Sequence, residues 1–524
     1  MAVSGEGQDW VGLRTFGPYQ QFRWILDVLS YFYSHYPDFM TKNYLYLINP
    51  ILGLLGLLGF GFGFLFNITA PLFTLIYFWH FLSLGTTRFV NHYYMKGLIS
   101  ALLWICQSGS GYSVDALIKG LWGRFRGRNT SLIGDTTCSR WKIWFIRAQV
   151  VIVFFFATST KIQEDWLRGE PWFTYITSTY RYRPILRWIV DFVLGSTKEA
   201  FREYALFISY AGIFYDSVII FVLLWLSWRP LEWKSKQSFL IFLFGFATSF
   251  TFHTSNAYIT QHIGQFPAMT TALYTIFFAF DWPLQLWNWF VSMIFHFGIF
   301  KYSYDMSNRT KLPKDVKNQT YLEMKNSRKK KRKDEKSISI LRILVILLII
   351  LWLSWQIYVP TRHLWREHRP LWDADNNYFG WRMMMTKRDW VRGHIEINHP
   401  ESNRTMLTVP LVDQFFFSDT MVGIQGSQLE RPQYIVFLAH HIAAEIEKKK
   451  GERPKVYAEA IVNLNSRGPQ NMLKEGVDLA AIPLSDLGKV EYLAKEVPLT
   501  EEQWRQIPEP FLSFIRFVNF PLWG

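Results

Sequence analysis

The sequence predicts a polytopic α-helical membrane protein with a C-terminal α+β soluble domain on the exported side. Half of the 524 residues are apolar and 18% are aromatic. The 24 tryptophans are typical of proteins whose Trp and Tyr side chains lie at membrane interfaces. Apolar runs of spanning length indicate roughly eight to nine membrane helices. Charged residues still make up 19% of the chain, so part of it must face water.

The charge and cysteine content exclude several classes of function. The formal net charge of +15 fits cytoplasmic loops that face anionic membrane lipid. No zinc-ligand spacing or RNA-binding signature accompanies it, so we expect no nucleic-acid partner. The two cysteines, Cys106 and Cys138, do not form a CxxC pair, which excludes a thiolate metal site, and we expect no bound metal.

The membrane helices are expected where long apolar runs occur. The clearest runs are 51–66, 71–84, 89–106, 141–160, 204–225, 239–255 and 263–280. The amphipathic stretch 19–36 could span the membrane or lie on it, and the Trp-rich piece 282–300 is too interrupted to assign. Glycines recur through 51–66, but all their neighbours are apolar, which favours close helix packing over a phosphate-binding loop.

The domain boundaries follow from a shift in composition. Residues 1–300 form the expected membrane domain, and 301–336 form a loop that ends in SRKKKRKDEK. A basic run just before a span is typical of a cytoplasmic anchor, so the last span, 337–359, should lead outward. Residues 360–524 are therefore expected in the lumen or periplasm, with a strand at 455–463 and a helix at 434–449.

Lys161 ends the apolar run 141–160 and has two interpretations. Its ammonium group could reach outward to lipid headgroups, which is the commoner role of a lysine at a helix end. It could instead be a dehydrated amine that acts as a base, because burial disfavours the charged form. The acidic and aromatic turn QEDWLRGEPW follows directly.

The expected topology brings further polar groups to the level of Lys161. Asn91 and His92 begin one helix, and His253 and Asn256 lie near the end of another. Each histidine alone is more often a packing or interfacial residue. Because ionisable groups inside membranes are commonly functional, their convergence with Lys161 predicts a shared site.

An ordered set of motifs resembles one family, the vitamin K-dependent gamma-glutamyl carboxylases and their bacterial relatives. The set runs from about Phe22 to about Ala480 and consists of VNHYYMKGLIS (90–100), YSVDA (112–116), WFIRAQ (144–149), TKIQEDWLRGEPW (160–172), FHTSNAYITQHIGQFP (252–267), AFDWP (279–283), FGWRMMM (379–385) and VNLNSRGPQNMLKEGVDLA (462–480). No single motif is decisive, but their order along the chain is specific.

The resemblance implies a reaction and a site. Vitamin K hydroquinone (reduced menaquinone or phylloquinone) reacts with O2 and becomes a strong base on its way to the epoxide. That base removes a γ-proton from a peptide glutamate, which then adds CO2. Lys161 falls on the family's proposed base. Together with the polar helix ends that converge on it, the expected site is Lys161, His92 and His253 for catalysis and Asn91, Asn256 and Trp166 for cofactor binding.

The expected partners are a glutamate-containing protein or peptide, membrane lipid and a quinone reductase that recycles the cofactor. The soluble domain should bind the protein substrate, with contributions from 379–385 and 462–480. Thr160 stands where animal members have the first of two lysines, and the soluble domain has no cysteine for a disulfide. The alternatives are a quinol-oxidising membrane enzyme with a non-protein substrate, and a non-enzymatic lipid-binding or transport protein. The host membrane is bacterial inner membrane or endoplasmic reticulum.

Overall fold

The computed structural model describes residues 54–518, apart from gaps at 89–90, 112, 129–138, 196, 229–235, 261–265, 278–339, 366–369, 373–377, 412–431 and 485–490. The amphipathic stretch 19–36, the Trp-rich piece 282–300, the basic loop 301–336 and Cys138 therefore lie outside the described residues.

Three described helices are long and apolar enough to cross a membrane. They correspond to α8 (Arg140–Thr160), α12 (Lys198–Trp228) and α17 (Ile340–Thr361). The sequence analysis expected spans at 141–160, 204–225 and 337–359, and each overlaps one of these helices, which supports the membrane assignment by length and composition. Eight to nine spans are more than the described residues show.

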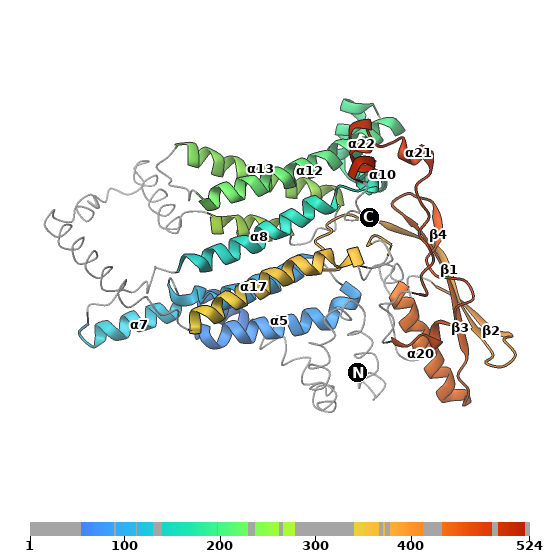
Figure 1. The fold of residues 1–524 in the computed structure, drawn as a ribbon, viewed down its shortest axis with the longest axis horizontal. Coiled ribbons are helices and arrows are strands. Elements are labelled where there is room, and N and C mark those ends of the chain that lie inside the picture. Colours follow the sequence, from blue (N-terminus) through green and yellow to red (C-terminus); the bar gives the residue numbers. More distant parts are fainter. Residues whose placement is uncertain are drawn as a thin grey trace.

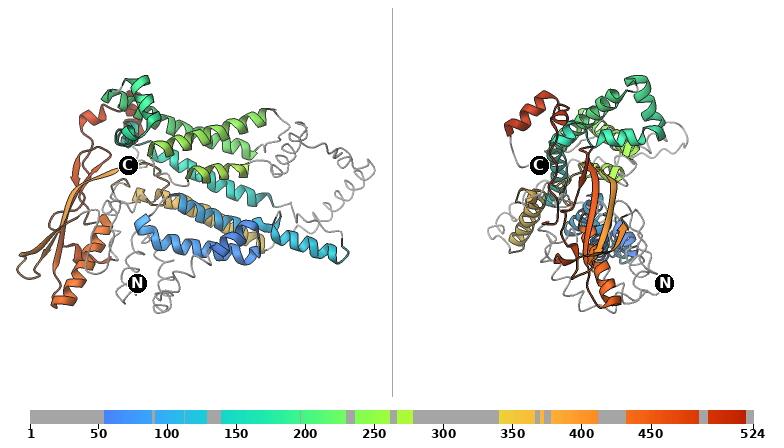
Figure 2. Two further views of the ribbon diagram at one scale, coloured as in Figure 1. Left: turned by 180° about the vertical axis from the view of Figure 1, so that it is seen from behind. Right: turned by 90° about the vertical axis from the view of Figure 1, so that its right-hand side faces the viewer.

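The long helices lie side by side, with the strands at one end of the bundle (Figures 1 and 2). We call this end the sheet-side end. The remaining helices are α5 (Phe66–Arg88), α6 (Asn91–Ile105), α7 (Val114–Phe125), α9 (Glu164–Leu167), α10 (Trp172–Thr179), α11 (Pro184–Trp188), α13 (Lys236–Thr260), α14 (Phe266–Tyr274), α20 (Pro432–Lys450), α21 (Glu501–Trp504) and α22 (Glu509–Val518).

Burial distinguishes the inner helices of the bundle from those at its edge. In α8, 61% of the apolar window is buried, against 17% in α17, whose exposed Leu and Ile side chains suit contact with lipid. A buried polar contact joins these two helices. The Gln149 side chain donates to Oε1 of Gln356 at 3.1 Å and accepts from Nε1 of Trp352 at 2.8 Å. Hydrogen bonds of this kind help to hold membrane helices together, because the hydrophobic effect does not drive helix association within lipid.

The glycine-rich run packs closely, as predicted. A Cβ atom on Gly59 would lie 2.5 Å from Thr69, and one on Gly63 would lie 2.4 Å from Ser113. The expected boundaries of the two N-terminal runs were wrong, however. Helical residues 54–62 end in a turn at Gly63, where φ is +65°, and α5 then runs without a break from Phe66 through Pro71.

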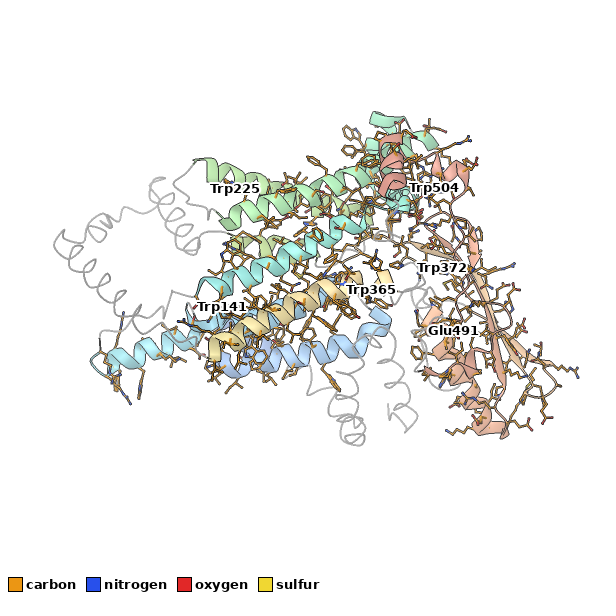
Figure 3. The ribbon with its side chains drawn as sticks, viewed as in Figure 1. Trp141, Trp225, Trp365, Trp372, Glu491 and Trp504 are labelled. Atoms are coloured by element: carbon orange, nitrogen blue, oxygen red, sulfur yellow. The ribbon has the colours of Figure 1, made fainter. Side chains whose placement is uncertain are left out.

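Tryptophans mark two levels along the bundle (Figure 3). Trp141 and Trp225 lie at the ends of α8 and α12 that face away from the sheet, and Trp365 lies near the sheet. Trp365 and Trp225 are exposed. Two levels of exposed indole rings are the pattern of a protein that meets two membrane interfaces.

The C-terminal domain is α+β, as predicted. Its strands are β1 (Arg388–Asn398), β2 (Thr405–Pro410), β3 (Lys455–Leu464) and β4 (Pro469–Asn471). They form an antiparallel sheet in the order β2-β1-β3-β4. α20 packs on it through a buried apolar stripe that includes Ile435, Ala439 and Ile442. The predicted strand 455–463 and helix 434–449 match β3 and α20 closely.

The sheet's core continues into the turn that follows α8. One apolar cluster joins Trp166 and Trp172 of that turn to Met385, Ile395 and Val462 of the C-terminal domain. The turn is therefore buried between the helical bundle and the sheet, rather than lying free at a membrane surface.

Candidate active site at the sheet-side end of the bundle

Lys161 caps α8, and its side chain points into the protein. Its backbone N–H donates to the carbonyl of Thr158 at 3.0 Å, which closes the last turn. The side chain is only 6% exposed and forms an ion pair with Asp216 of α12. Nζ lies 5.1 Å from the centre of the Trp166 ring. The amine therefore contacts a carboxylate and an aromatic face, and does not reach outward to headgroups.

Asp216 was not among the site residues expected from the sequence. It lies in the middle of the long apolar helix α12, and its side chain is 4% exposed. A lone acid in such a helix is a functional candidate, and that signal was available in the sequence. Its partner was not, because 55 positions separate it from Lys161. Removing either member would leave the other buried and uncompensated, which is strongly destabilising.

His253 lies in the same neighbourhood, on α13. It is buried, and its ring meets the edge of Tyr215 with ring centres 5.8 Å apart. Tyr215 precedes Asp216 in α12, and its hydroxyl lies 2.9 Å from that of Tyr274. Lys161, Asp216 and His253 thus form one buried group, with Asn256 one turn further along α13.

Asn91 and His92 form a second group at the start of α6. His92 is buried, and Asn91 donates to the backbone carbonyl of Arg382 at 3.4 Å. Arg382 belongs to the FGWRMMM motif between α17 and β1. Asn91 therefore contacts this motif, whereas His92 packs on the ring of its neighbour Tyr93, and no described contact joins either residue directly to Lys161.

The FGWRMMM motif is held against α6 by aromatic contacts. Trp381 stacks on Tyr94 with ring centres 5.2 Å apart, and Phe379 meets the same tyrosine edge-on at 4.8 Å. Phe379, Trp381 and Met384 all have positive φ values near 60°. Non-glycine residues rarely adopt this conformation, so the motif's path is fixed by its surroundings. Phe154 of α8 belongs to the same apolar cluster, which links the two groups of site residues.

A buried charge network fixes the turn after α8 to the C-terminal domain. Asp165 is fully buried and accepts hydrogen bonds from Arg168 at 2.9 and 3.0 Å and from Arg467 at 3.1 Å. Asn465 also donates to it, at 3.0 Å. Burial alone would raise the pKa of Asp165, but the guanidinium groups of Arg467 and Arg168 hold it below its usual value.

Arg467 is the centre of this network. It also contacts Glu164 at 3.3 Å and Glu496 at 2.7 Å, and the three carboxylates raise its pKa against the opposing effect of burial. The pKa of Glu170 shifts in the opposite direction to that of Asp165. It accepts from the Thr174 hydroxyl at 2.9 Å and lies 3.4 Å from Arg202, yet burial is the larger effect and raises its pKa.

Two family models cover most of the chain. The HTTM domain model matches residues 20–282, and the model of the vitamin K-dependent gamma-carboxylase lumenal domain matches residues 341–498. The chain belongs to the gamma-carboxylase family. No solved structure matches the chain. Two different models in the expected order confirm the resemblance that the motifs indicated.

Membership in the gamma-carboxylase family implies vitamin K hydroquinone as cofactor, and the residues around Lys161 fit such a group. A quinol is an apolar ring with two hydroxyl groups, and it needs a polar partner in apolar surroundings. Lys161 supplies a buried amine at the end of α8, and Phe156 and Ala157 in the preceding turn are buried apolar residues. Trp166 is only 1% exposed, and its indole N–H donates to the carbonyl of Ser209 at 2.8 Å. The Trp166 ring is thereby fixed against Lys161 and has little surface left for a ligand.

Proposed function

We propose that this protein carboxylates glutamate side chains of a protein substrate to gamma-carboxyglutamate, using vitamin K hydroquinone, O2 and CO2. The observation that carries the proposal is the buried contact of Lys161 with Asp216 and Trp166, in a member of the gamma-carboxylase family. An amine in such a place serves proton transfer better than membrane anchoring.

The cofactor, when bound and oxidised by O2, supplies a base strong enough to remove a γ-proton of glutamate, which no side chain can do. The protein's own part is smaller. Lys161 Nζ takes up and releases a proton, and Asp216 Oδ2 is the partner that can share it. Trp166 positions Lys161, and His253, which packs against Tyr215 next to Asp216, is proposed to orient a polar group at the site.

Exclusion of water is the second contribution of the protein. The turn after α8 is covered by the C-terminal domain, and Asp165, Trp166 and Leu167 are at most 1% exposed. A dry site prevents water from protonating reactive species before they meet their substrate. The network around Arg467 thus supports the chemistry by keeping the cover in place.

We further propose the arrangement of the domains. Residues 1–300 form the membrane domain, 301–336 lie in the cytoplasm, 337–359 cross the membrane, and 360–524 lie on the opposite side and bind the protein substrate. The segment 462–480 supplies the end of β3 and all of β4, and Arg467 within it is paired with Asp165, which supports a scaffold role for part of it. Asn256, His92 and Asn91 remain proposed members of the site.

The proposal is tested with purified protein in lipid nanodiscs. Reduced vitamin K, labelled CO2 and a peptide with one glutamate are supplied, and mass spectrometry measures carboxylated peptide while chromatography measures epoxide. Carboxylation with matching epoxide supports the proposal. Epoxide without any carboxylated peptide would indicate a quinol oxidase with another substrate, and the absence of both products would indicate a lipid-binding or transport protein.

A further inference from the structure

Arg382 carries a buried positive charge that no described side chain compensates. It is 4% exposed, and its Nε and Nη2 atoms have no hydrogen-bond partner among the described residues. Burial and the neighbouring Arg362 lower its pKa to about 9, so it stays charged at neutral pH. Among the described residues, no acidic group acts on it in the opposite direction. A buried charge in this state is unfavourable unless a ligand supplies the missing partner.

Other buried arginines of the described residues contrast with Arg382. Arg168 and Arg467 are paired with carboxylates, and Arg362 donates to the carbonyls of Val359, at 2.6 Å, and of Tyr378. These three side chains hold the fold together. Arg382 donates nothing through Nε or Nη2, so structural pairing does not account for its burial.

Two further polar atoms, on residues next to Arg382 in the chain or in contact with its backbone, also lack hydrogen-bond partners in the described part of the structure. The indole N–H of Trp381, the preceding residue, is a buried donor, and Oδ1 of Asn91 is a buried acceptor. The Asn91 amide is tied to this place because its Nδ2 donates to the Arg382 carbonyl. A ligand that accepts hydrogen bonds in one part and donates one in another would satisfy all of these atoms.

The chemistry of the free atoms selects a carboxylate. Nε and Nη2 lie on one edge of the guanidinium plane, and this edge donates two parallel hydrogen bonds that match the two oxygens of a carboxylate. A peptide that carries the carboxylate also brings backbone N–H groups, which Oδ1 of Asn91 can accept. Trp381 shares its apolar cluster with Phe154 and Phe156 of α8. Lys161 caps the same helix.

We propose that Arg382 binds the side-chain carboxylate of the substrate glutamate and so aims that residue at the site around Lys161. This inference rests on the proposed function, since it names how the same site takes its substrate. Arg382 is a binding residue in this account, and it transfers no proton.

The test measures binding rather than turnover. Fluorescence anisotropy gives the Kd of a short labelled peptide, blocked at both ends, that carries one glutamate, and of the same peptide with glutamine. Full-length protein in nanodiscs is used without quinol or CO2. The wild type should prefer the glutamate peptide by about 30-fold, equivalent to about 2 kcal/mol.

Three variants make the result specific. Arg382→Gln should bind both peptides equally, and Arg382→Lys should keep only part of the preference, because an ammonium group cannot bind a carboxylate side-on with two donors. The matched control is Arg392→Gln, which removes an exposed arginine whose side chain is 70% accessible and should leave the preference unchanged. An unchanged preference in Arg382→Gln would overturn the proposal.

Thermal stability separates this role from a structural one. Without peptide, Arg382→Gln should unfold at the same temperature as the wild type or higher, because it removes an uncompensated buried charge. The glutamate peptide should stabilise the wild type more than the glutamine peptide does, whereas the two peptides should have the same effect on the variant. A large loss of stability with the preference retained, or Arg382-dependent stabilisation by bicarbonate or chloride but not by peptide, would contradict the assignment. Because no turnover is measured, a failure of carboxylation would leave these outcomes readable.

Discussion

Replacing Arg467 should loosen the C-terminal domain from the turn after α8. The network contains three carboxylates, of Asp165, Glu164 and Glu496, and two guanidinium groups, of Arg467 and Arg168. Arg467→Gln would leave the three carboxylates with one guanidinium group. Removing one partner of a buried ion pair lowers the free energy of unfolding by about 3–5 kcal/mol. Because the remaining carboxylates would also repel one another, we expect Arg467→Gln to cost about 5 kcal/mol.

Asp165→Asn should lower the free energy of unfolding less, by about 2 kcal/mol. It removes the best-bonded acceptor but leaves two carboxylates facing two guanidinium groups, so no excess charge remains. The double variant should lose less than the two single variants together, by about 2 kcal/mol, because both act on the same contact. The pKa of Asp165 lies below 3.8, so this contribution is present at neutral pH and is lost only as the pH falls below that value.

Hydrogen exchange is the suitable assay, because a protein with two domains need not unfold in one step. Exchange should quicken in segments 163–170 and 463–471 of both single variants, and thermal unfolding should begin earlier. The matched control is Arg505→Gln, whose pair with Glu501 is exposed at 3.6 Å and is worth at most about 0.5 kcal/mol. If Arg467→Gln behaves like Arg505→Gln, the network does not hold the two parts together.

Two further predictions concern a second carboxyl group and the topology. The raised pKa of Glu170 means that its stabilising, protonated form is complete below 4.5 and is lost as the pH rises through the folded value. Glu170→Gln, which is always neutral, should therefore flatten the fall in thermal midpoint as the pH rises above 4.5; an unchanged slope would rule this out. Asn403 begins the sequon NRT in the exposed turn between β1 and β2, and it should carry glycan when the protein is made in a eukaryotic secretory membrane. Asn318 should stay bare, and glycan there would reverse the orientation.

Helices and strands could be predicted where the local pattern of apolar residues shows which side chains are buried. The apolar run 141–160 matches α8, and the alternating strand 455–463 matches β3, each within one residue. The start of α12 was placed six residues late, at 204, because charged residues precede it. The helix begins at Lys198, since this part packs on the turn after α8, where Arg202 contacts Glu170.

The contacts that define the site were not predictable in this way. Arg467 reaches Asp165 across 302 positions, and Lys161 reaches Asp216 across 55. No periodicity in the sequence encodes which buried charge meets which. The residue types at the site could be selected from the sequence, whereas the pairing of Lys161 with Asp216 and the isolation of Arg382 required the fold.

The inward orientation of Lys161 changes how its role must be tested. The sequence analysis left open whether this lysine reaches lipid headgroups or acts as a buried base. In the structure Lys161→Ala would leave the Asp216 carboxylate buried and unpaired, so a loss of activity could reflect unfolding. Arginine retains the charge and can retain the pairing, but it cannot release a proton at physiological pH.

The central claim is therefore tested most directly by epoxide formation and peptide carboxylation in Lys161→Arg, measured beside its thermal stability. The double variant Lys161→Met/Asp216→Asn is the companion, because it removes both charges together and leaves neither uncompensated. The account predicts folded protein and loss of both products in each variant. Carboxylation near the wild-type rate by stable Lys161→Arg protein would contradict it.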